Sequence, residues 1–279
     1  MDVVFQHWSA SWPVLSAYVL LAAWHLAGLR TALATPAPGT TRHQLAREAA
    51  VFQLGLAVIA AALVSPLGYW STVYLSVRAI QELLAAVVGP GLLVLGAPWA
   101  AMRLGRNFLT RTAARPVLAV AAANVVWIGW QLPILADAAH GNAAARVAEY
   151  AAYLVAGVVF WLQLISSHPV AQESSPLRRF ALLAGTVIAS TVVGMALVFG
   201  ANKLYPAYGG PLHSGMTVVQ DQQLAGAILW MGMLFPLVAA GVALLMQWFS
   251  NEESAELAAG FDRLLAPRRH DWPSRPVHR

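Results

Sequence analysis

Residues 78–98 constrain the fold of this chain more than any other stretch. Three polar side chains open it: Arg78, Gln81 and Glu82. From there the chain carries no charge as far as Met102, which is long enough to cross a bilayer. A Gly-Pro-Gly break at residues 89–91 lies near the middle, and a membrane helix tolerates such a break when neighbouring helices satisfy the freed carbonyl groups. The stretch therefore predicts a membrane-spanning helix, and its polar start is a candidate site because ionisable groups at membrane depth are rare.

The rest of the chain has the same apolar character. Of its 279 residues, 59% are hydrophobic and only 10% are charged, which is typical of a polytopic membrane protein. The net charge of +5 comes from arginines in loops between apolar spans. That placement indicates contact with anionic lipid and favours no nucleic-acid partner. The absence of cysteine excludes disulfides, thiolate metal sites and CxxC redox chemistry.

Seven apolar segments predict an all-α protein with seven transmembrane helices. The predicted spans are residues 13–34, 47–65, 74–97, 116–133, 145–166, 180–200 and 223–249. We expect residues 1–249 to form one transmembrane domain. Residues 250–279 are expected to form a polar cytoplasmic tail that holds a short helix before Pro267 and is otherwise disordered.

The placement of basic residues predicts the orientation of the bundle. Fourteen of the 17 Lys and Arg residues lie on one side, in loops 30–47, 103–115 and 178–179 and in the tail. The other side holds Arg78, Arg146 and Lys203. The positive-inside rule then places the N-terminus outside and the C-terminus in the cytoplasm. An odd number of spans requires the same separation of the two ends.

The first apolar segment resembles a signal peptide because small residues, Ala32-Leu33-Ala34, follow it. However, the chain opens with Asp2 and has no basic residue before Arg30. A signal peptide begins with a positively charged region. We therefore expect the first segment to be retained as a membrane span.

This orientation gathers polar side chains from several helices at the extracytoplasmic mouth. The candidate partner or ligand face consists of Arg78, Gln81, Glu82, Trp130, Gln131, Pro133, Glu149, Tyr150, Asp221 and Gln222. Arg78 and Glu82 are four residues apart and share a helix face, while Glu149 and Asp221 are further acceptors for Arg78. Two interpretations stay open: solvated or ion-paired helix ends at the headgroup level, or a polar vestibule that binds a partner or ligand.

The histidines give weak support for a metal site. No two of the eight are three or four residues apart, so no helix is expected to present a paired ligand face. His25 stands alone in the first span and is expected to be a hydrogen-bonded interior residue. His7, His140 and His213 fall on the outer side and could converge with Met216 on copper, since imidazole and thioether groups suit that ion. We expect no cofactor, with copper as the alternative.

Several catalytic classes are disfavoured. Lys203, the only lysine, lies in a loop, which excludes a retinal protein. The chain contains no Walker, GxSxG or HExxH sequence, and its unpaired histidines count against haem ligation. We therefore expect no enzymatic activity and no catalytic residues.

Sequence motifs along most of the chain nevertheless resemble one family. The motifs are LSAYVLLAAWHLAGLR, FQLGLAVIAAALVSPLGYW, GPGLLVLGAP, WQLPILADAA, then Glu149 with VVFW, the pair Tyr205-Pro206, and DQQLAGAILW. In this order and spacing they resemble CtaG, the cytochrome c oxidase assembly factor family of the caa3-type oxidase group. The resemblance implies a seven-span protein of the bacterial inner membrane that assists assembly of a haem-copper oxidase. Oxidase subunits or other respiratory membrane proteins would then be its partners, beside the lipid bilayer.

The departures from that family affect the expected site. The family has histidines at the positions of Arg78, Glu82 and Gln131, and another near Tyr150, and this chain has none of them. The resemblance implies that five residues of the family's site are retained in this chain: Gln81, Trp130, Pro133, Asp221 and Gln222. An Arg78–Glu82 ion pair is expected where the family has a pair of imidazoles. The alternatives are therefore a diverged accessory or structural subunit of a respiratory complex that binds no metal, and a copper-handling membrane protein.

Overall fold

The computed structural model describes residues 8, 12–34, 36, 40–96, 115–165, 175–208 and 215–265, with side chains as far as Ser250. Every element in these ranges is helical, as predicted. In chain order the elements are α1 (Trp12–Ala34), α2 (Arg42–Val64), α3 (Pro66–Trp70), α4 (Leu75–Leu83), η1 (Leu84–Val88), α5 (Gly89–Leu95), α8 (Pro116–Trp130), α9 (Pro133–Gly141), α10 (Ala143–Leu164), α11 (Pro176–Val198), η2 (Pro206–Tyr208) and α12 (Val218–Leu265).

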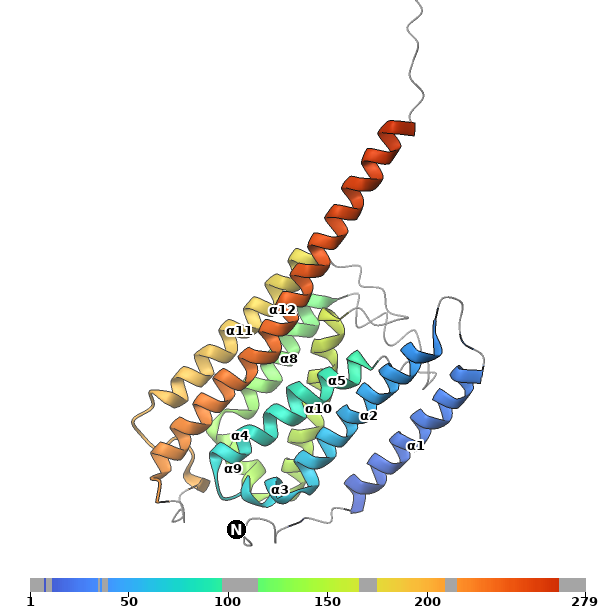
Figure 1. The fold of residues 1–279 in the computed structure, drawn as a ribbon. Coiled ribbons are helices and arrows are strands. Elements are labelled where there is room, and N and C mark those ends of the chain that lie inside the picture. The colour runs from blue at the N-terminus through green and yellow to red at the C-terminus, as the bar shows by residue number, and fades with distance from the viewer. Residues whose placement is uncertain are drawn as a thin grey trace, which may run out of the picture.

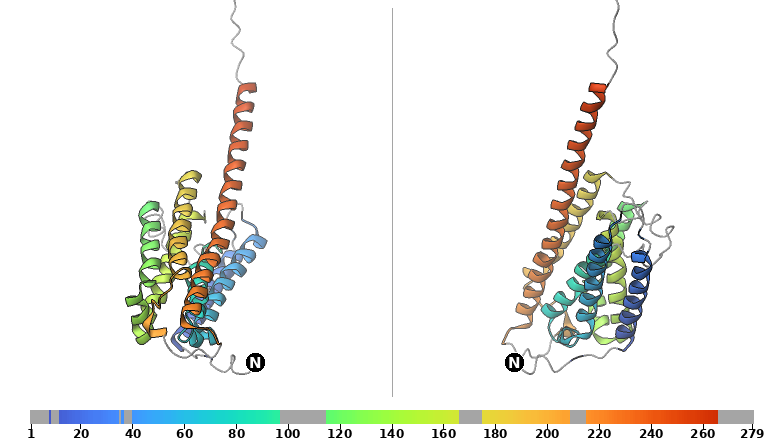
Figure 2. Two further views of the ribbon diagram at one scale, coloured as in Figure 1. Left: turned by 90° about the vertical axis from the view of Figure 1, so that its left-hand side faces the viewer. Right: turned by 45° about the vertical axis from the view of Figure 1, so that its right-hand side comes forward.

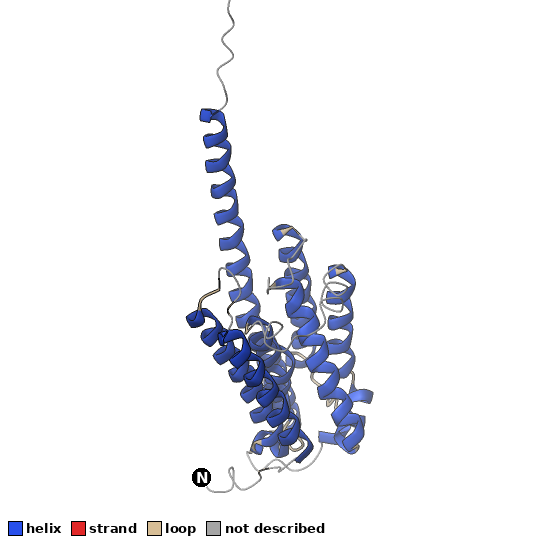
Figure 3. Ribbon diagram, turned by 90° about the vertical axis from the view of Figure 1, so that its right-hand side faces the viewer, coloured by secondary structure: helices blue, strands red, loops and turns tan. Residues whose placement is uncertain are grey.

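The long helices form one bundle around the rod made by α4, η1 and α5 (Figure 1). This rod packs against α2, α10 and α12, while α11 lies along α12 and α8 lies along α10. α1 packs on the outer side of α2 (Figure 1). Figure 3 shows the same bundle from the side, and every regular element of the described residues in it is a helix. Residues 78–95, most of the stretch that constrains the fold most strongly, therefore lie at the centre of the bundle.

Six helices are long and apolar enough to cross a membrane, and the count rises to seven if α8 and α9 together form one span. α8 has only 15 residues, which gives it a length of about 22 Å. The hydrocarbon core of a bilayer is about 30 Å thick. α9 follows after a bend of 68°. The predicted span 116–133 is thus a short helix that turns sharply at one end of the bundle.

The Gly-Pro-Gly break is accommodated by a change of helix type. The five residues of η1 form one π-helical turn directly before Gly89 and Pro90. The indole nitrogen of Trp161, on α10, donates a hydrogen bond of 2.8 Å to the carbonyl oxygen of Val87. A neighbouring helix therefore donates a hydrogen bond to the π turn, while the carbonyl group that Pro90 leaves without its helical donor is that of Ala86.

Close approach of α10 to the break depends on Gly157. A Cβ atom at this position would lie 2.2 Å from the carbonyl oxygen of Ala86 and 2.7 Å from the Cγ atom of Pro90. Around this contact the largest buried cluster brings together the aromatic rings of Trp127, Phe160 and Trp161, whose neighbouring centroids are 5.3 and 5.5 Å apart. Tight packing of this kind, rather than exclusion of water, holds helices together in lipid.

α12 continues well past the predicted end of the last span. It runs without interruption for 48 residues, a length of about 72 Å, and projects beyond the other helices (Figure 2). The short helix expected before Pro267 is thus a continuation of α12 to Leu265. Residues 266–279, predicted to be disordered, lie outside the described residues.

His25 of α1 has the interior role predicted for it. Its side chain is buried, its Nδ1 atom lies 3.0 Å from Nε2 of Gln53, and its ring lies against Phe52 with a centroid distance of 4.2 Å. Both partners belong to α2. The residue therefore helps to hold α1 against the bundle.

Candidate functional site

The polar residues singled out from the sequence meet at one end of the bundle. This end, called the α9 end below, contains α3, α9 and η2 together with the first turns of α4, α10 and α12 (Figure 1). Consecutive helices of the bundle run in opposite directions, so the starts and ends of different helices alternate there. Residues far apart in the chain are thereby placed within hydrogen-bonding distance.

The bend between α8 and α9 follows from Pro133. Proline disfavours helical geometry in the residue before it, and Leu132 is accordingly extended, with φ −66° and ψ 132°. α8 therefore ends at Trp130, and carbonyl groups there lose their helical partners. The carbonyl oxygen of Gln131 accepts a hydrogen bond of 2.8 Å from the hydroxyl group of Tyr205. That of Trp130 accepts one of 3.3 Å from Arg78.

Arg78 lies at the centre of a buried ion cluster. Its Nε atom donates to Oε1 of Glu82 at 2.6 Å, and its Nη2 atom donates to Oε1 of Glu149 on α10. All three side chains are at most 5% exposed. Nη1 donates to the carbonyl oxygen of Ala136 in α9, at 3.4 Å. One guanidinium group thus joins α4, α8, α9 and α10.

Two glutamines and two tyrosines extend this cluster. Nε2 of Gln131 donates to Oε2 of Glu82 at 2.6 Å and to the hydroxyl oxygen of Tyr153 at 3.4 Å. The hydroxyl group of Tyr150 donates to Oε1 of Gln81. Nε2 of Gln81 donates to the carbonyl oxygen of Ala62 at 2.7 Å, near the end of α2. Both carboxylate oxygens of Glu82 and both polar atoms of the Gln81 amide are therefore engaged inside the bundle.

Asp221 does not pair with Arg78; it caps α4 from another helix. Tyr74, the residue before α4, provides no side-chain cap. Oδ2 of Asp221 accepts from the backbone nitrogen of Leu75 at 2.6 Å, and Oδ1 accepts from the nitrogen and the hydroxyl group of Ser76, at 3.2 and 2.5 Å. A carboxylate in this position satisfies orphan donors and interacts favourably with the positive end of the helix dipole.

Gln222, the next residue, fixes the loop that leads to η2. Its Oε1 atom accepts from the nitrogen of Leu204 at 2.9 Å, and its Nε2 atom donates to the carbonyl oxygen of Asn202 at 3.2 Å. Asp137 of α9 accepts from the nitrogen of Ala207 at 3.2 Å. The loop is thus tied to both α12 and α9.

The structure adds Tyr205 and Tyr208, which the sequence prediction had not placed in the site. The hydroxyl group of Tyr208 donates to the carbonyl oxygen of Ser71 at 3.2 Å and accepts from Nη1 of Arg78 at 3.5 Å. Burial raises the pKa of both phenols, so they stay neutral at physiological pH. A buried tyrosine needs a hydrogen-bond partner, and two tyrosines three residues apart beside a polar mouth were the signal available in the sequence.

The predicted site residues are therefore together but turned inward. Arg78, Gln81, Glu82, Glu149, Asp221 and Gln222 are buried, and Trp130, Gln131, Pro133 and Tyr150 are half-buried. The vestibule expected from the sequence is largely filled by its own side chains. A polar cavity of only about 10 Å³ remains beside Arg78 and Glu149, and Thr72, His140 and Arg146 contribute to its lining.

The centre of the ion cluster is unfavourable for a metal cation. The guanidinium group of Arg78 occupies the centre of the cluster and repels a cation, while Glu82 and Glu149 already compensate it. Among the residues that the structure describes, no group of three or more His, Cys, Asp or Glu side chains could hold a metal ion. His140 and Met216 are half-buried. His7 and His213 lie outside the described residues, so the four-residue copper hypothesis stays a prediction.

Comparison with known proteins identifies a family. The model of the family described as cytochrome c oxidase caa3 assembly factor (Caa3_CtaG) matches residues 18–251. No curated protein and no solved structure matches significantly. The matched range contains the whole buried cluster, from Arg78 to Gln222.

Proposed function

Since this chain belongs to the cytochrome c oxidase caa3 assembly factor family, we propose that it assists the assembly of a haem-copper cytochrome c oxidase in the bacterial inner membrane. The observation that carries this proposal is the family match over residues 18–251. That range includes the bundle and its ion cluster, so the similarity concerns the whole architecture and not a single motif. Its role is that of a non-enzymatic assembly factor.

The proposed working surface is the α9 end, facing the extracytoplasmic side. The C-terminal end of α1 and the N-terminal ends of α2 and α11 lie at the opposite end, from which α12 projects (Figure 1). These three helix ends carry Arg30, Arg42, Arg47 and Arg178. By the positive-inside rule, an arginine-rich end favours the cytoplasm, which supports an outward-facing α9.

Within this surface, the buried cluster positions α9 and the exposed residues of α9 make the contact. Arg78 and Tyr205 bind the carbonyl groups at the bend, and Asp137 ties α9 to the loop before α12. Held in this way, α9 exposes apolar side chains, with Ile134 77% and neighbouring Leu132 51% exposed. We assign these side chains the contact with an oxidase subunit, because apolar anchors held on a rigid element dominate binding energy at interfaces.

A deletion strain tests the proposal. Deleting the gene is expected to reduce assembled oxidase, measured by the haem absorption of membranes and by oxidase subunit levels, and the unaltered gene should restore both. Ile134→Gln should restore about fivefold less oxidase at equal protein abundance, since an interface anchor contributes more than 1 kcal/mol. The matched control is Leu177→Gln, at a 75% exposed position on α11 at the other end of the bundle. Normal oxidase in the deletion strain would refute the assembly role.

Purification in mild detergent separates the alternatives. An assembly factor should co-purify with incomplete oxidase, and the finished enzyme should lack it. Constant stoichiometry with a finished respiratory complex would instead identify an accessory subunit. The histidines that the resemblance implies at the positions of Arg78, Glu82 and Gln131 are absent from this chain, which favours this second role. Stoichiometric copper in the same sample would support the copper-handling hypothesis and contradict the electrostatic argument from Arg78.

A further inference from the structure

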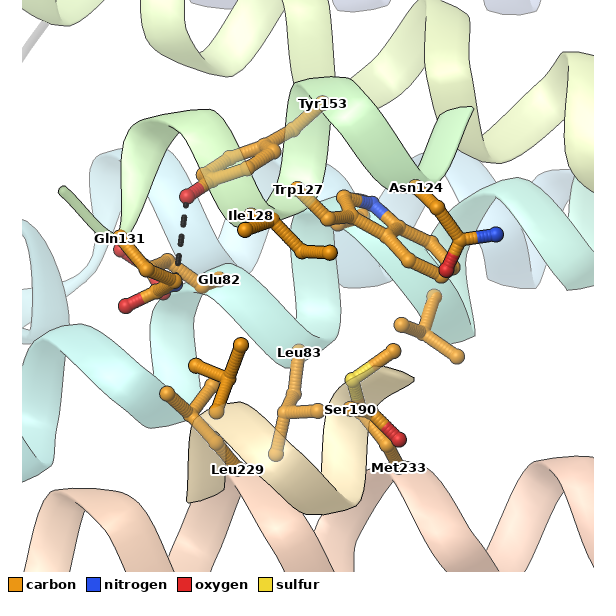
Figure 4. A pocket seen from close by; sticks show the side chains of 13 residues that line it. Glu82, Leu83, Asn124, Trp127, Ile128, Gln131, Tyr153, Ser190, Leu229 and Met233 are labelled. Carbon is orange, nitrogen blue, oxygen red and sulfur yellow. Dashed lines mark hydrogen bonds between the residues drawn. The ribbon is translucent and has the colours of Figure 1, made fainter. Parts of the chain in front are cut away.

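A second feature, a pocket inside the membrane, lies between the ion cluster and the lipid. It has a cavity volume of about 50 Å³ and is walled by α4 with η1, α8, α10, α11 and α12 (Figure 4). The apolar part of the lining consists of Leu83, Ala86, Val87, Trp127, Ile128, Val193, Leu229 and Met233. Apolar walls with a few polar groups are typical of sites that bind small molecules.

The pocket opens toward lipid. Four of its partly exposed lining residues, Asn124, Ile128, Ser190 and Val193, belong to α8 and α11. Asn124 and Ser190 lie well inside these two helices. The outer faces of the same helices expose apolar residues such as Val125 (70%). A ligand therefore enters from the hydrocarbon core between α8 and α11.

Three polar side chains of the pocket lie at one end, and Asn124 and Ser190 lie toward the other (Figure 4). Figure 4 shows Glu82, Gln131 and Tyr153 together at the first end, with Leu229 and Met233 along the opposite wall. Tyr153 is 1% exposed, and its hydroxyl oxygen accepts from Gln131 at 3.4 Å. Within the described part of the chain its O–H group has no acceptor. The indole nitrogen of Trp127 likewise has no partner there.

These groups select the chemistry of the occupant. The Tyr153 hydroxyl and the Trp127 indole nitrogen are both donors, so their complement is an acceptor oxygen. Both oxygens of Glu82 already accept hydrogen bonds, from Arg78 and Gln131, and Arg78 is compensated by two carboxylates. The pocket therefore offers no free charge to a charged ligand, and burying an unpaired charge among apolar walls is unfavourable.

We propose that this pocket binds a neutral lipid-soluble molecule whose carbonyl oxygen accepts a hydrogen bond from Tyr153. The apolar chain of the ligand lies along Leu229 and Met233 and leaves between α8 and α11. A void of this size is unusual in a packed interior, and an apolar chain fills it without loss of hydrogen bonds. An acyl lipid ester and an isoprenoid quinone share this chemistry.

Photolabelling tests the proposal and distinguishes a lipid ester from a quinone as the ligand. The protein is placed in nanodiscs of dioleoylphosphatidylcholine with one of two diazirine probes, an acyl-labelled phosphatidylcholine or a decyl benzoquinone. Labelled residues are identified by mass spectrometry after illumination. Label on the buried lining residues Trp127, Leu229 or Met233 is expected for the probe that binds, and this shows which of the two ligand classes the pocket accepts. Label confined to outward residues such as Val125 would overturn the proposal for both.

Two variants on adjacent positions provide the control. Val193→Phe places a ring in the pocket and should reduce specific labelling about fivefold or more, because a filled cavity cannot accept the ligand. Val192→Phe, at a position 62% exposed on the outer face of α11, should leave labelling unchanged. Equal labelling of both variants would contradict the proposal.

A third variant keeps the test valid if Val193→Phe does not fold. Tyr153→Phe retains the ring and loses only the hydroxyl group. The concentration of unlabelled ligand needed to displace the probe should rise roughly 2- to 10-fold, which is the effect of losing one hydrogen bond. An unchanged concentration would refute the contact between Tyr153 and the carbonyl group. No oxidase takes part in these measurements, so their outcome is independent of the assembly role.

Discussion

Arg78 on α4 and Glu149 on α10 form a buried ion pair although they are 71 positions apart in the chain. Glu82 completes the cluster from the same helix as Arg78. A charge at membrane depth is costly unless paired, so this cluster permits few alternative rotations of α4 and α10. The geometry of the α9 end depends on it.

The first prediction concerns the loss of the central cation. Arg78→Met should lower the free energy of unfolding by about 3–5 kcal/mol, because it leaves two buried carboxylates without compensation. The measurement is denaturant unfolding in mild detergent, followed by tryptophan fluorescence. Arg178→Met, at an exposed position of α11, should change stability by less than about 0.5 kcal/mol. Equal effects would show that the cluster does not stabilise the bundle.

The second prediction is a partial rescue. Adding Glu149→Gln to Arg78→Met removes one of the two uncompensated carboxylates, so the double variant should be more stable than Arg78→Met alone. The expected coupling between the two sites is about 1–3 kcal/mol. The same unfolding assay measures it through a double-mutant cycle. Simple additivity of the two single effects would mean that the residues do not interact.

The third prediction concerns the cap that Asp221 provides. Asp221→Asn replaces one accepting oxygen by a donor and should cost about 1–2 kcal/mol. Hydrogen exchange of the Leu75 and Ser76 amides should accelerate accordingly. Asp137→Asn is the control, since its remaining oxygen can still accept the single bond from Ala207. Unchanged exchange at both amides in Asp221→Asn would rule out capping from α12.

The fourth prediction concerns the contact between α10 and the helix break. Gly157→Ala places a methyl group 2.2 Å from the carbonyl oxygen of Ala86 and should cost about 1–3 kcal/mol through overpacking. The matched control is Gly185→Ala on α11, where a new Cβ atom meets nothing within 4 Å. It should be neutral or stabilising by up to about 1 kcal/mol. The reverse order of stabilities would contradict the described packing.

The sequence could predict which residues gather at the site, but it could not predict which of them pair with one another. The sequence placed Arg78, Glu82, Glu149 and Gln131 at one end of the bundle, because helix boundaries and alternating directions follow from the apolar runs. It favoured Glu82 as the partner of Arg78 and left open whether Glu149 or Asp221 also pairs with it. The structure pairs Arg78 with both glutamates and turns Asp221 toward α4. Spacing along one helix predicted only the Glu82 contact.

By itself, the sequence determined that the chain forms apolar helices and where most of them begin and end, because backbone groups in lipid must be hydrogen-bonded within each helix. Tertiary structure alone decided three features: the inward burial of the polar mouth, the π turn at residues 84–88 with its donor from Trp161, and the roles of Tyr205 and Tyr208. Each depends on the rotation and distance of helices that are remote in the chain. Those quantities are set by side-chain packing between helices, which no local pattern of residues specifies.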